Sequence, residues 1–524
     1  MHAHTSYVFA PTASPAAYGA SIPKFRLLRW APLAAISSAN CYHRRTIRPN
    51  ATLLMKEFAA YIDWLATAMY WPWTVCILLA MGIFFTIKTR FVQVRRFREA
   101  LKLMVADKQS GTEGALSPFQ AFMTGLAATI GTGNIAGVAT AIIQGGPGAL
   151  FWIWVYGFLA TAVKFSEAAL GLKYRVTEDG KTLSGPMYYL RDGLKSPALA
   201  WIYVLIAGIA CLFTTPFTQP NSIAVAVDSQ LKNHDLDLAN YTPASVSGWL
   251  GDVEPNRLAI GVLLAVLTWL VVIGGVKAIG RAAERLSPLK VGLYLFGGVV
   301  VIITHLSSLP EVLTLVFREA FSREACLGTA EGAAVWAALR YGLARGSYAN
   351  EAGYGTTAVV YGVAKSDRPD QQGLNAVMEV FIITFVTSTI SALTILLTGA
   401  WKKTGIESSA AVAEAFNASM PIVGGWMLAI SMFLFGYTTL MGWAFFGEQF
   451  LEYLFGSWII RPYRWIYCLL IPIGAVAKVD LVWAWGDILN GSQIFPNLVG
   501  IIALSGVAAY YAKKRSVDAA PDVP

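Results

Sequence analysis

The sequence predicts an all-α membrane protein with about 11 transmembrane helices. Of its 524 residues, 56% are hydrophobic and only 14% are charged, whereas soluble globular proteins carry about 25% charged residues. The chain also contains 17 tryptophans and 22 tyrosines, which are enriched at membrane–water interfaces. The net charge of +9 is therefore expected in cytoplasmic loops, and it does not indicate a nucleic-acid partner.

Residues 1–54 differ in composition from the rest of the chain. They contain lysines and arginines but no Asp or Glu, and their apolar stretch at 31–39 is too short to cross a bilayer. The segment could be a transit-like leader, a disordered tail, or sequence upstream of the true start at Met55. We expect this basic extension to be absent from the working protein.

Apolar segments follow in order along the remaining chain. They lie at about 71–87, 116–144, 148–172, 197–226, 257–276, 286–306, 332–362, 373–400, 422–452, 463–477 and 481–512. A transmembrane helix needs about 20 mainly apolar residues, so each segment is a candidate span. The fourth is interrupted at Pro216 and Pro220, and the last at Asn490, Gly491 and Pro496, because proline removes a backbone donor.

Loop charges fix the expected orientation. Basic residues concentrate in the loops that follow the first, third, fifth, seventh and ninth segments, with Lys277 to Lys290 counted after the fifth, and in the tail at 513–524. By the positive-inside rule these loops are cytoplasmic. The N-terminus is then outside and the C-terminus inside. This orientation would put the basic extension outside the cell, against the positive-inside rule, and therefore supports its absence.

The second segment is interrupted at its centre by small and polar residues. Residues 129–137 read Thr-Ile-Gly-Thr-Gly-Asn-Ile-Ala-Gly, and each glycine weakens a helix by about 1 kcal/mol. Non-helical backbone survives in hydrocarbon only where protein or a water-filled cavity satisfies it. The stretch predicts either a broken helix whose free main chain faces a site, or a close-packing face formed by Gly133 and Gly137.

A second interruption lies in the seventh segment, at 345–357. It contains Arg345, Asn350 and Glu351, and a central charge costs about 2.5–3.5 kcal/mol to insert. Such residues face a cavity, or they pair structurally with other helices. The two interrupted segments are five apart, which predicts an inverted repeat with a binding site between its matched breaks. Residues 55–512 would form the transporter domain, with an extra helix at 70–90 and repeats at 116–306 and 332–512.

Other polar residues within apolar segments leave two interpretations each. Lys164 and Glu167 share one helical face and predict an internal ion pair or, alternatively, ion coordination. Gln219 and Asn221 flank Pro220, at a pocket or simply at a helix end. Thr438 and Thr439 could bond back to their own helix, or join free carbonyls in an oxygen cage for a monovalent cation.

No catalytic or metal motif is evident. The five cysteines contain no CxxC pair, and the chain has no HExxH, GxSxG or Walker pattern. We therefore expect no enzyme. A channel is the rival from another class, although two unlike halves argue for alternating access.

The motifs at these positions resemble the alanine or glycine:cation symporter family of the amino acid/polyamine/organocation superfamily. The resemblance is carried by the stretches at 131–137, 145–149, 164–167, 185–189 and 344–353, and it covers about 58–505. It implies a leucine-transporter-type fold, a five-plus-five inverted repeat preceded by one extra helix. It also implies sodium-driven import of a small neutral amino acid, alanine or glycine, across the plasma (inner) membrane. Proton coupling through Glu351 or Glu167, and glutamine or serine as the substrate, remain alternatives.

The resemblance also implies site residues. The turn at 131–134 resembles the family's carboxylate-binding break, and 350–353 resembles the opposing break. The expected substrate-binding residues are Thr129, Gly131, Thr132, Gly133, Asn134, Gln219, Asn221, Ser347, Asn350 and Gly353. The expected sodium ligands are Ala127, Ile130, Thr438 and Thr439, and the expected structural or gating residues are Lys164, Glu167, Arg345 and Glu351. Departures from the family pattern at Pro220, Tyr348, Ala349 and Tyr354 bear on the size of the accepted amino acid.

Overall fold

The computed structural model describes residues 60–514, except for 63, 67, 70–72, 106–112, 179, 241–252, 322–329 and 404–407. The predicted extension at 1–54 and almost all of the predicted tail at 513–524 lie outside the described residues. The chain divides into the units Met1–Trp64 and Leu65–Pro524, and the following description concerns the second unit.

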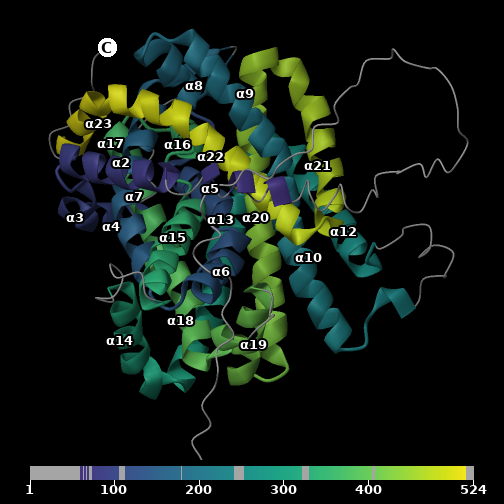
Figure 1. The fold of residues 1–524 in the computed structure, drawn as a ribbon. Coiled ribbons are helices and arrows are strands. Elements are labelled where there is room, and N and C mark those ends of the chain that lie inside the picture. The colour runs from purple at the N-terminus through teal and green to yellow at the C-terminus, as the bar shows by residue number, and fades with distance from the viewer. Residues whose placement is uncertain are drawn as a thin grey trace, which may run out of the picture. The chain divides into compact units, whose positions relative to one another are not determined.

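The described chain is built almost entirely of helices (Figure 1). The α-helices are α2 (Val75–Lys88), α3 (Val92–Arg95), α4 (Phe97–Val105), α5 (Pro118–Thr129), α6 (Ala136–Gly145), α7 (Ala149–Lys173), α8 (Pro186–Tyr188), α9 (Pro197–Phe213), α10 (Thr215–Asn233), α12 (Pro255–Val272), α13 (Gly275–Thr304), α14 (Leu309–Ala320), α15 (Ala330–Asn350), α16 (Thr356–Gly362), α17 (Pro369–Val380), α18 (Thr389–Thr398), α19 (Ser408–Ser419), α20 (Val423–Phe455), α21 (Ile460–Val476), α22 (Val479–Ala503) and α23 (Ser505–Lys513). Short 3₁₀ or π segments are η3 (Thr132–Asn134), η4 (Tyr189–Gly193), η5 (Leu238–Asn240), η6 (Leu306–Ser308), η8 (Phe381–Ser388), η9 (Ala400–Lys402) and η10 (Ser457–Ile459). The strands β1 (Val176–Glu178) and β2 (Lys181–Leu183) pair antiparallel.

By length and composition, seven helices in the described part of the chain could cross a membrane, or nine if each of two sharply bent pairs counts as one span. The helix α2 has only 14 residues, and the α15–α16 segment, which carries the predicted charges, is not among those that qualify. The all-α membrane architecture is confirmed. The count of 11 spans stays a prediction.

Two predicted interruptions are placed differently by the structure. The last predicted segment does not break at Asn490, Gly491 or Pro496, because α22 runs through all three. The bend comes later, where α22 meets α23 at an angle of 63°. In the fourth segment the break falls at Thr214, and α10 runs through Pro220 without interruption. Pro216 lies in the first turn of α10, where a missing backbone donor costs little.

The first broken helix occupies the centre of the helix assembly. The helix α5 packs against α13, α16 and α20, while α6 packs against α15 and α19. On one side α7 packs against α15, α16 and α17, and on the other α20 packs against α9, α10 and α13. Figure 1 shows α14 and α19 at one end of the assembly and α8 and α23 at the other. The predicted site at 129–137 therefore lies between two groups of helices.

The start of α5 is well specified by its sequence. The Ser117 hydroxyl accepts from the Gln120 backbone N–H at 3.1 Å, and the Gln120 side chain accepts from the Ser117 N–H at 3.2 Å. Pro118 occupies the first turn. This reciprocal cap satisfies donors that a helix start otherwise leaves free. The helix α5 therefore begins at a defined point on the N-terminal side of the break.

Candidate functional site

The first predicted break is confirmed. The half-helices Pro118–Thr129 and Thr132–Gly145 meet at 66°. Gln219 Oε1 accepts hydrogen bonds from both the N–H and the hydroxyl of Thr132, each at 3.0 Å. The Asn134 amide donates to the Thr129 carbonyl at 3.0 Å. Side chains thus satisfy part of the main chain that unwinding sets free, as buried backbone requires.

Glycine is required in this break by close approach of its neighbours. A Cβ at Gly131 would lie 2.9 Å from Gln219 Oε1 and from Thr439 Oγ1, and one at Gly133 would lie 2.9 Å from the ring of Tyr348. At Gly137 the nearest atom would be Arg345 Cδ at 3.8 Å, an ordinary contact. A close-packing face formed by Gly133 and Gly137 therefore does not explain the glycine at 137, because a Cβ would fit there.

The second break lies at 351–355, between α15 and α16. Glu351 (φ +54°), Gly353 (φ +92°) and Gly355 (φ +86°) all have positive φ, a conformation that is unusual for a residue with a Cβ such as Glu351. The break begins later than 345, where the predicted interruption at 345–357 starts. Ser347 and Asn350 consequently belong to the last turns of α15.

Glu167 holds the second break in place. Its Oε1 accepts from the backbone N–H groups of Gly353 and Gly355, at 3.1 and 3.2 Å. Asn497 donates to the same oxygen at 2.7 Å and to the Gly353 carbonyl at 2.8 Å. The side chain of Glu167 is fully buried, so these donors supply partners to one of the two oxygens of a buried carboxylate.

The predicted ion pair between Lys164 and Glu167 is wrong, because Lys164 pairs with Glu379 instead. Lys164 Nζ lies 2.5 Å from Glu379 Oε1, and both side chains are only 1% exposed. Glu379 also accepts from the Thr129 hydroxyl at 2.8 Å and from the Tyr361 hydroxyl at 2.6 Å. This buried network ties the end of α5 to α7, α16 and α17.

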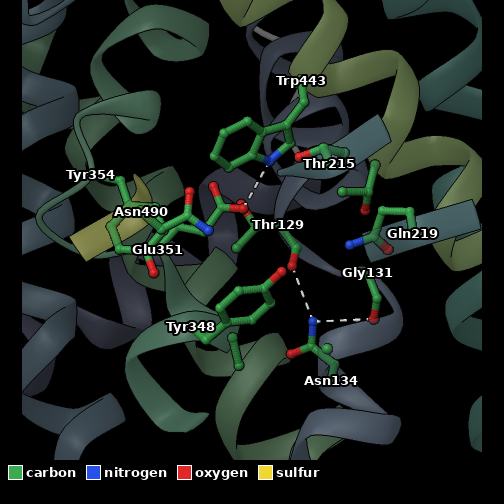
Figure 2. A pocket seen from close by; sticks show the side chains of 13 residues that line it. Thr129, Gly131, Asn134, Thr215, Gln219, Tyr348, Glu351, Tyr354, Trp443 and Asn490 are labelled. Atoms are coloured by element: carbon green, nitrogen blue, oxygen red, sulfur yellow. Dashed lines mark hydrogen bonds between the residues drawn. The ribbon is translucent and has the colours of Figure 1, made fainter. Parts of the chain in front are cut away.

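A small pocket lies between the two breaks (Figure 2). Its lining residues come from α5, η3, α10, α15, α20, α22 and the two breaks. They are Thr129, Gly131, Gly133, Asn134, Thr215, Gln219, Tyr348, Ala349, Glu351, Tyr354, Thr439, Trp443 and Asn490. The cavity volume is about 10 Å³, which is about the space of one water-sized sphere.

Glu351 places a carboxylate in this pocket. Figure 2 shows the indole of Trp443 directed at it, and Trp443 Nε1 donates to Glu351 Oε1 at 2.9 Å. The Thr356 hydroxyl donates to Oε2 at 3.0 Å. The pocket therefore has a negative group at the second break and, at the first, the start of the half-helix Thr132–Gly145, which carries partial positive charge.

An ion pair lies near the pocket, one turn earlier along α15 than the pocket residue Tyr348. The Arg345 guanidinium is 3.2 Å from an Asp487 carboxylate oxygen, and the two side chains are 16% and 18% exposed. Arg345 also lies over the Trp483 ring at 5.5 Å, and Trp483 contacts the Tyr348 ring at 5.3 Å. This layer joins α15 to α22, and the gating role expected for Arg345 stays a prediction.

The predicted sodium-cage oxygens come together, but a lysine ammonium lies among them. Lys290 Nζ donates to the carbonyl of Ala127 at 3.2 Å, to that of Ile130 at 2.8 Å and to the Thr438 hydroxyl at 2.6 Å. Thr439 joins through its hydroxyl, which donates to the Ala127 carbonyl at 3.1 Å. Lys290 is predicted from the sequence to belong to a cytoplasmic loop, whereas it lies within α13 and is fully buried.

Five of the ten predicted substrate residues line the pocket, namely Thr129, Gly131, Gly133, Asn134 and Gln219. The other five do not. Thr132 bonds to Gln219, and Asn221 instead donates to the carbonyls of Gly474 and Ala477. Asn350 bonds to Gly346 and Thr384, Gly353 bonds to Glu167 and Asn497, and Ser347 is buried within α15.

Three lining residues were missed by sequence reasoning, namely Thr215, Trp443 and Asn490. Trp443 follows Thr439 by four residues on α20, a spacing that puts both on one helical face. Asn490 stood in a recognised interruption but was not considered for the site. Thr215 gave no signal beyond its place beside Pro216.

Comparisons with known proteins agree with this architecture. A model of the sodium:alanine symporter family matches residues 55–519. The sodium/alanine symporter AgcS of Methanococcus maripaludis is 36% identical over 466 residues, covering 87% of this chain and 97% of that protein. A Bacillus subtilis protein named "Probable sodium/glutamine symporter GlnT" is 32% identical over 458 residues, covering 86% of this chain and 90% of that protein. The crystal structure of MhsT in complex with L-phenylalanine has a TM-score of 0.53 at 15% identity, covering 77% of this chain and 99% of that chain. This last likeness shows the fold, which is of the leucine-transporter type.

Proposed function

Because the chain belongs to the sodium:alanine symporter family and is a multi-pass membrane transport protein, we propose that it imports a small neutral amino acid in symport with a cation. Alanine or glycine is the proposed substrate, and the family implies sodium as the coupling ion. The observation that carries the proposal is the pocket between two unwound helix segments.

The pocket offers opposite charges to the two ends of a zwitterion. A substrate carboxylate would lie at the start of the half-helix Thr132–Gly145, where the helix dipole favours an anion. The substrate ammonium would face the Glu351 carboxylate, which lines the pocket. Removal from bulk water strengthens both interactions.

The walls of the pocket favour a small side chain. The rings of Tyr348 and Trp443 and the side chain of Tyr354 bound a cavity of only about 10 Å³, so an amino acid enters only as these side chains move. Larger substrates would clash with more of the wall, which is how a pocket rejects them. Relatives named for alanine and for glutamine keep both open as substrates, and the small cavity favours alanine.

Transport would proceed by alternating access. The group formed by α5, α6, α7 and α15–α17 would rock against the group formed by α9, α10, α13 and α20, exposing the pocket to each side in turn. We propose that the chain lies in the plasma (inner) membrane with its N-terminus outside and its C-terminus in the cytoplasm. A membrane potential then contributes about 2.3 kcal/mol per charge per 100 mV.

Uptake of labelled alanine into proteoliposomes tests this function. The proposal predicts saturable uptake driven by an imposed cation gradient and inhibited by excess unlabelled alanine. Uptake that survives replacement of sodium by potassium but collapses with a protonophore would favour proton coupling. Flux that does not saturate would favour a channel, and no uptake above protein-free liposomes would contradict the proposal.

A further inference from the structure

The cage that was expected to hold sodium is formed by neutral oxygens at the end of α5. The carbonyls of Leu126, Ala127 and Ile130 lie 3.2, 3.2 and 2.8 Å from Lys290 Nζ. The Thr438 hydroxyl of α20 lies 2.6 Å from the same nitrogen. Carbonyls at a helix C-terminus carry partial negative charge, so this group of oxygens is suited to a cation.

The Lys290 ammonium relies on this cage. Lys290 is fully buried, and within the described part of the chain no carboxylate lies within ion-pair distance of its nitrogen. Lys290 Nζ lies over the Phe435 ring, 5.3 Å from the ring centroid, and an aromatic face is a further neutral group that attracts cations. The side chain thus meets the same kind of surroundings that an alkali cation would require.

We infer that Lys290 is a tethered cation that takes the place of a free sodium ion at this cage, so that the chain neither binds nor carries sodium there. The consequence for transport depends on the proposed function, whereas the occupancy of the cage does not. Any sodium dependence of uptake would then arise at a different site.

Two features make the lysine and a sodium ion mutually exclusive. The ammonium already contacts every oxygen that was expected to ligate sodium except the Thr439 hydroxyl, and like charges at such short range repel strongly in a low dielectric. The lysine is also held in position, because the Ser287 hydroxyl, three residues earlier on α13, donates to the Met123 carbonyl of α5 at 2.9 Å. The hydrogen bond between Ser287 and Met123 therefore holds α13 against α5 and keeps the ammonium at the end of α5.

A tethered charge differs from a sodium ion in its fate during the transport cycle. It can balance the partial negative charge of the carbonyls at the end of α5 and link this helix to α20, but it cannot leave the protein with the substrate. A purely structural role would use the same contacts to cap α5. The two roles differ in what happens when the ammonium is removed, because only a cation site can be refilled by a free cation.

The test uses purified full-length protein and compares its melting temperature in sodium chloride with that in potassium chloride at equal ionic strength. Four forms are compared: the wild type, Thr438→Val, Lys290→Ala, and Lys290→Ala combined with Thr438→Val. We expect any difference in melting temperature between sodium and potassium to be the same for the wild type and for Thr438→Val. Lys290→Ala should melt at a lower temperature and regain stability in sodium but not in potassium, and the added Thr438→Val should abolish this gain. A folded Lys290→Ala that gains nothing from sodium would overturn the inference.

Binding of radioactive sodium to the wild type decides the matter if Lys290→Ala does not fold. The inference predicts that Thr438→Val leaves the amount of sodium bound to the wild type unchanged. Saturable sodium binding that is lost in Thr438→Val would contradict it. Binding of labelled alanine to the same samples separates the two proposals, because its absence would refute the proposed function without altering the result at the cage.

Discussion

Replacing Glu167 by glutamine is expected to weaken the second helix break by about 3 kcal/mol. Three N–H groups donate to Glu167 Oε1. Hydrogen bonds to a charged group contribute about 1.5–3 kcal/mol each and neutral ones about 0.5–1.5, so loss of the charge weakens each bond by about 1 kcal/mol. Because Glu351 and Tyr354 of this break line the pocket, the affinity for the amino acid should fall as well.

Equilibrium unfolding in detergent, followed by tryptophan fluorescence, measures the loss of stability. Glu178→Gln is the matched control, since Glu178 is exposed on β1 and surface substitutions usually change stability by about 0.5 kcal/mol or less. Labelled-alanine binding is measured on the same preparations. The reasoning is refuted if Glu167→Gln unfolds with the same free energy as Glu178→Gln.

Three further changes probe the pocket and its gate. Trp443→Phe removes one hydrogen bond to a carboxylate and should weaken alanine binding by roughly tenfold, measured by equilibrium dialysis; Trp426→Phe, which alters the same helix beside His234, should have no such effect. Asp487→Asn should change the unfolding free energy by less than about 1 kcal/mol, because its pair with Arg345 is part-exposed. It should nevertheless speed substrate release in a stopped-flow chase, and an unchanged rate would count against a gate. Asn134→Ala leaves the break without a buried hydrogen bond of about 1–3 kcal/mol and should lower the kcat/KM of uptake at least tenfold; uptake at the wild-type rate would contradict its place in the site.

The positions of both breaks could be predicted because their signals are local. Glycine and polar residues inside an apolar segment disfavour a continuous helix, so they indicate an interruption directly. The structure has the first break within 129–137. The second break is shifted toward 351–355, because Asn350 can bond back to Gly346 and remain helical. Local sequence identifies an interruption better than it fixes the boundary.

The side-chain partners could not be predicted because they are set by tertiary packing. Lys164 pairs with Glu379 rather than with its helical neighbour Glu167, and no spacing in the sequence indicates this. The sequence predicts a loop position for Lys290 because it stands beside a run of basic residues. The helix α13 begins at Gly275, however, well before the apolar segment, and it carries this lysine into the interior.

The central claim is that two unwound segments enclose an amino-acid site, and equilibrium binding of labelled alanine to the purified full-length protein tests it most directly. Gly133→Leu is the decisive comparison, since even a Cβ at Gly133 would lie 2.9 Å from the ring of Tyr348. We predict saturable binding to the wild type and none to Gly133→Leu of equal monodispersity. Undetectable binding to the wild type, or equal binding to both proteins, would contradict the account.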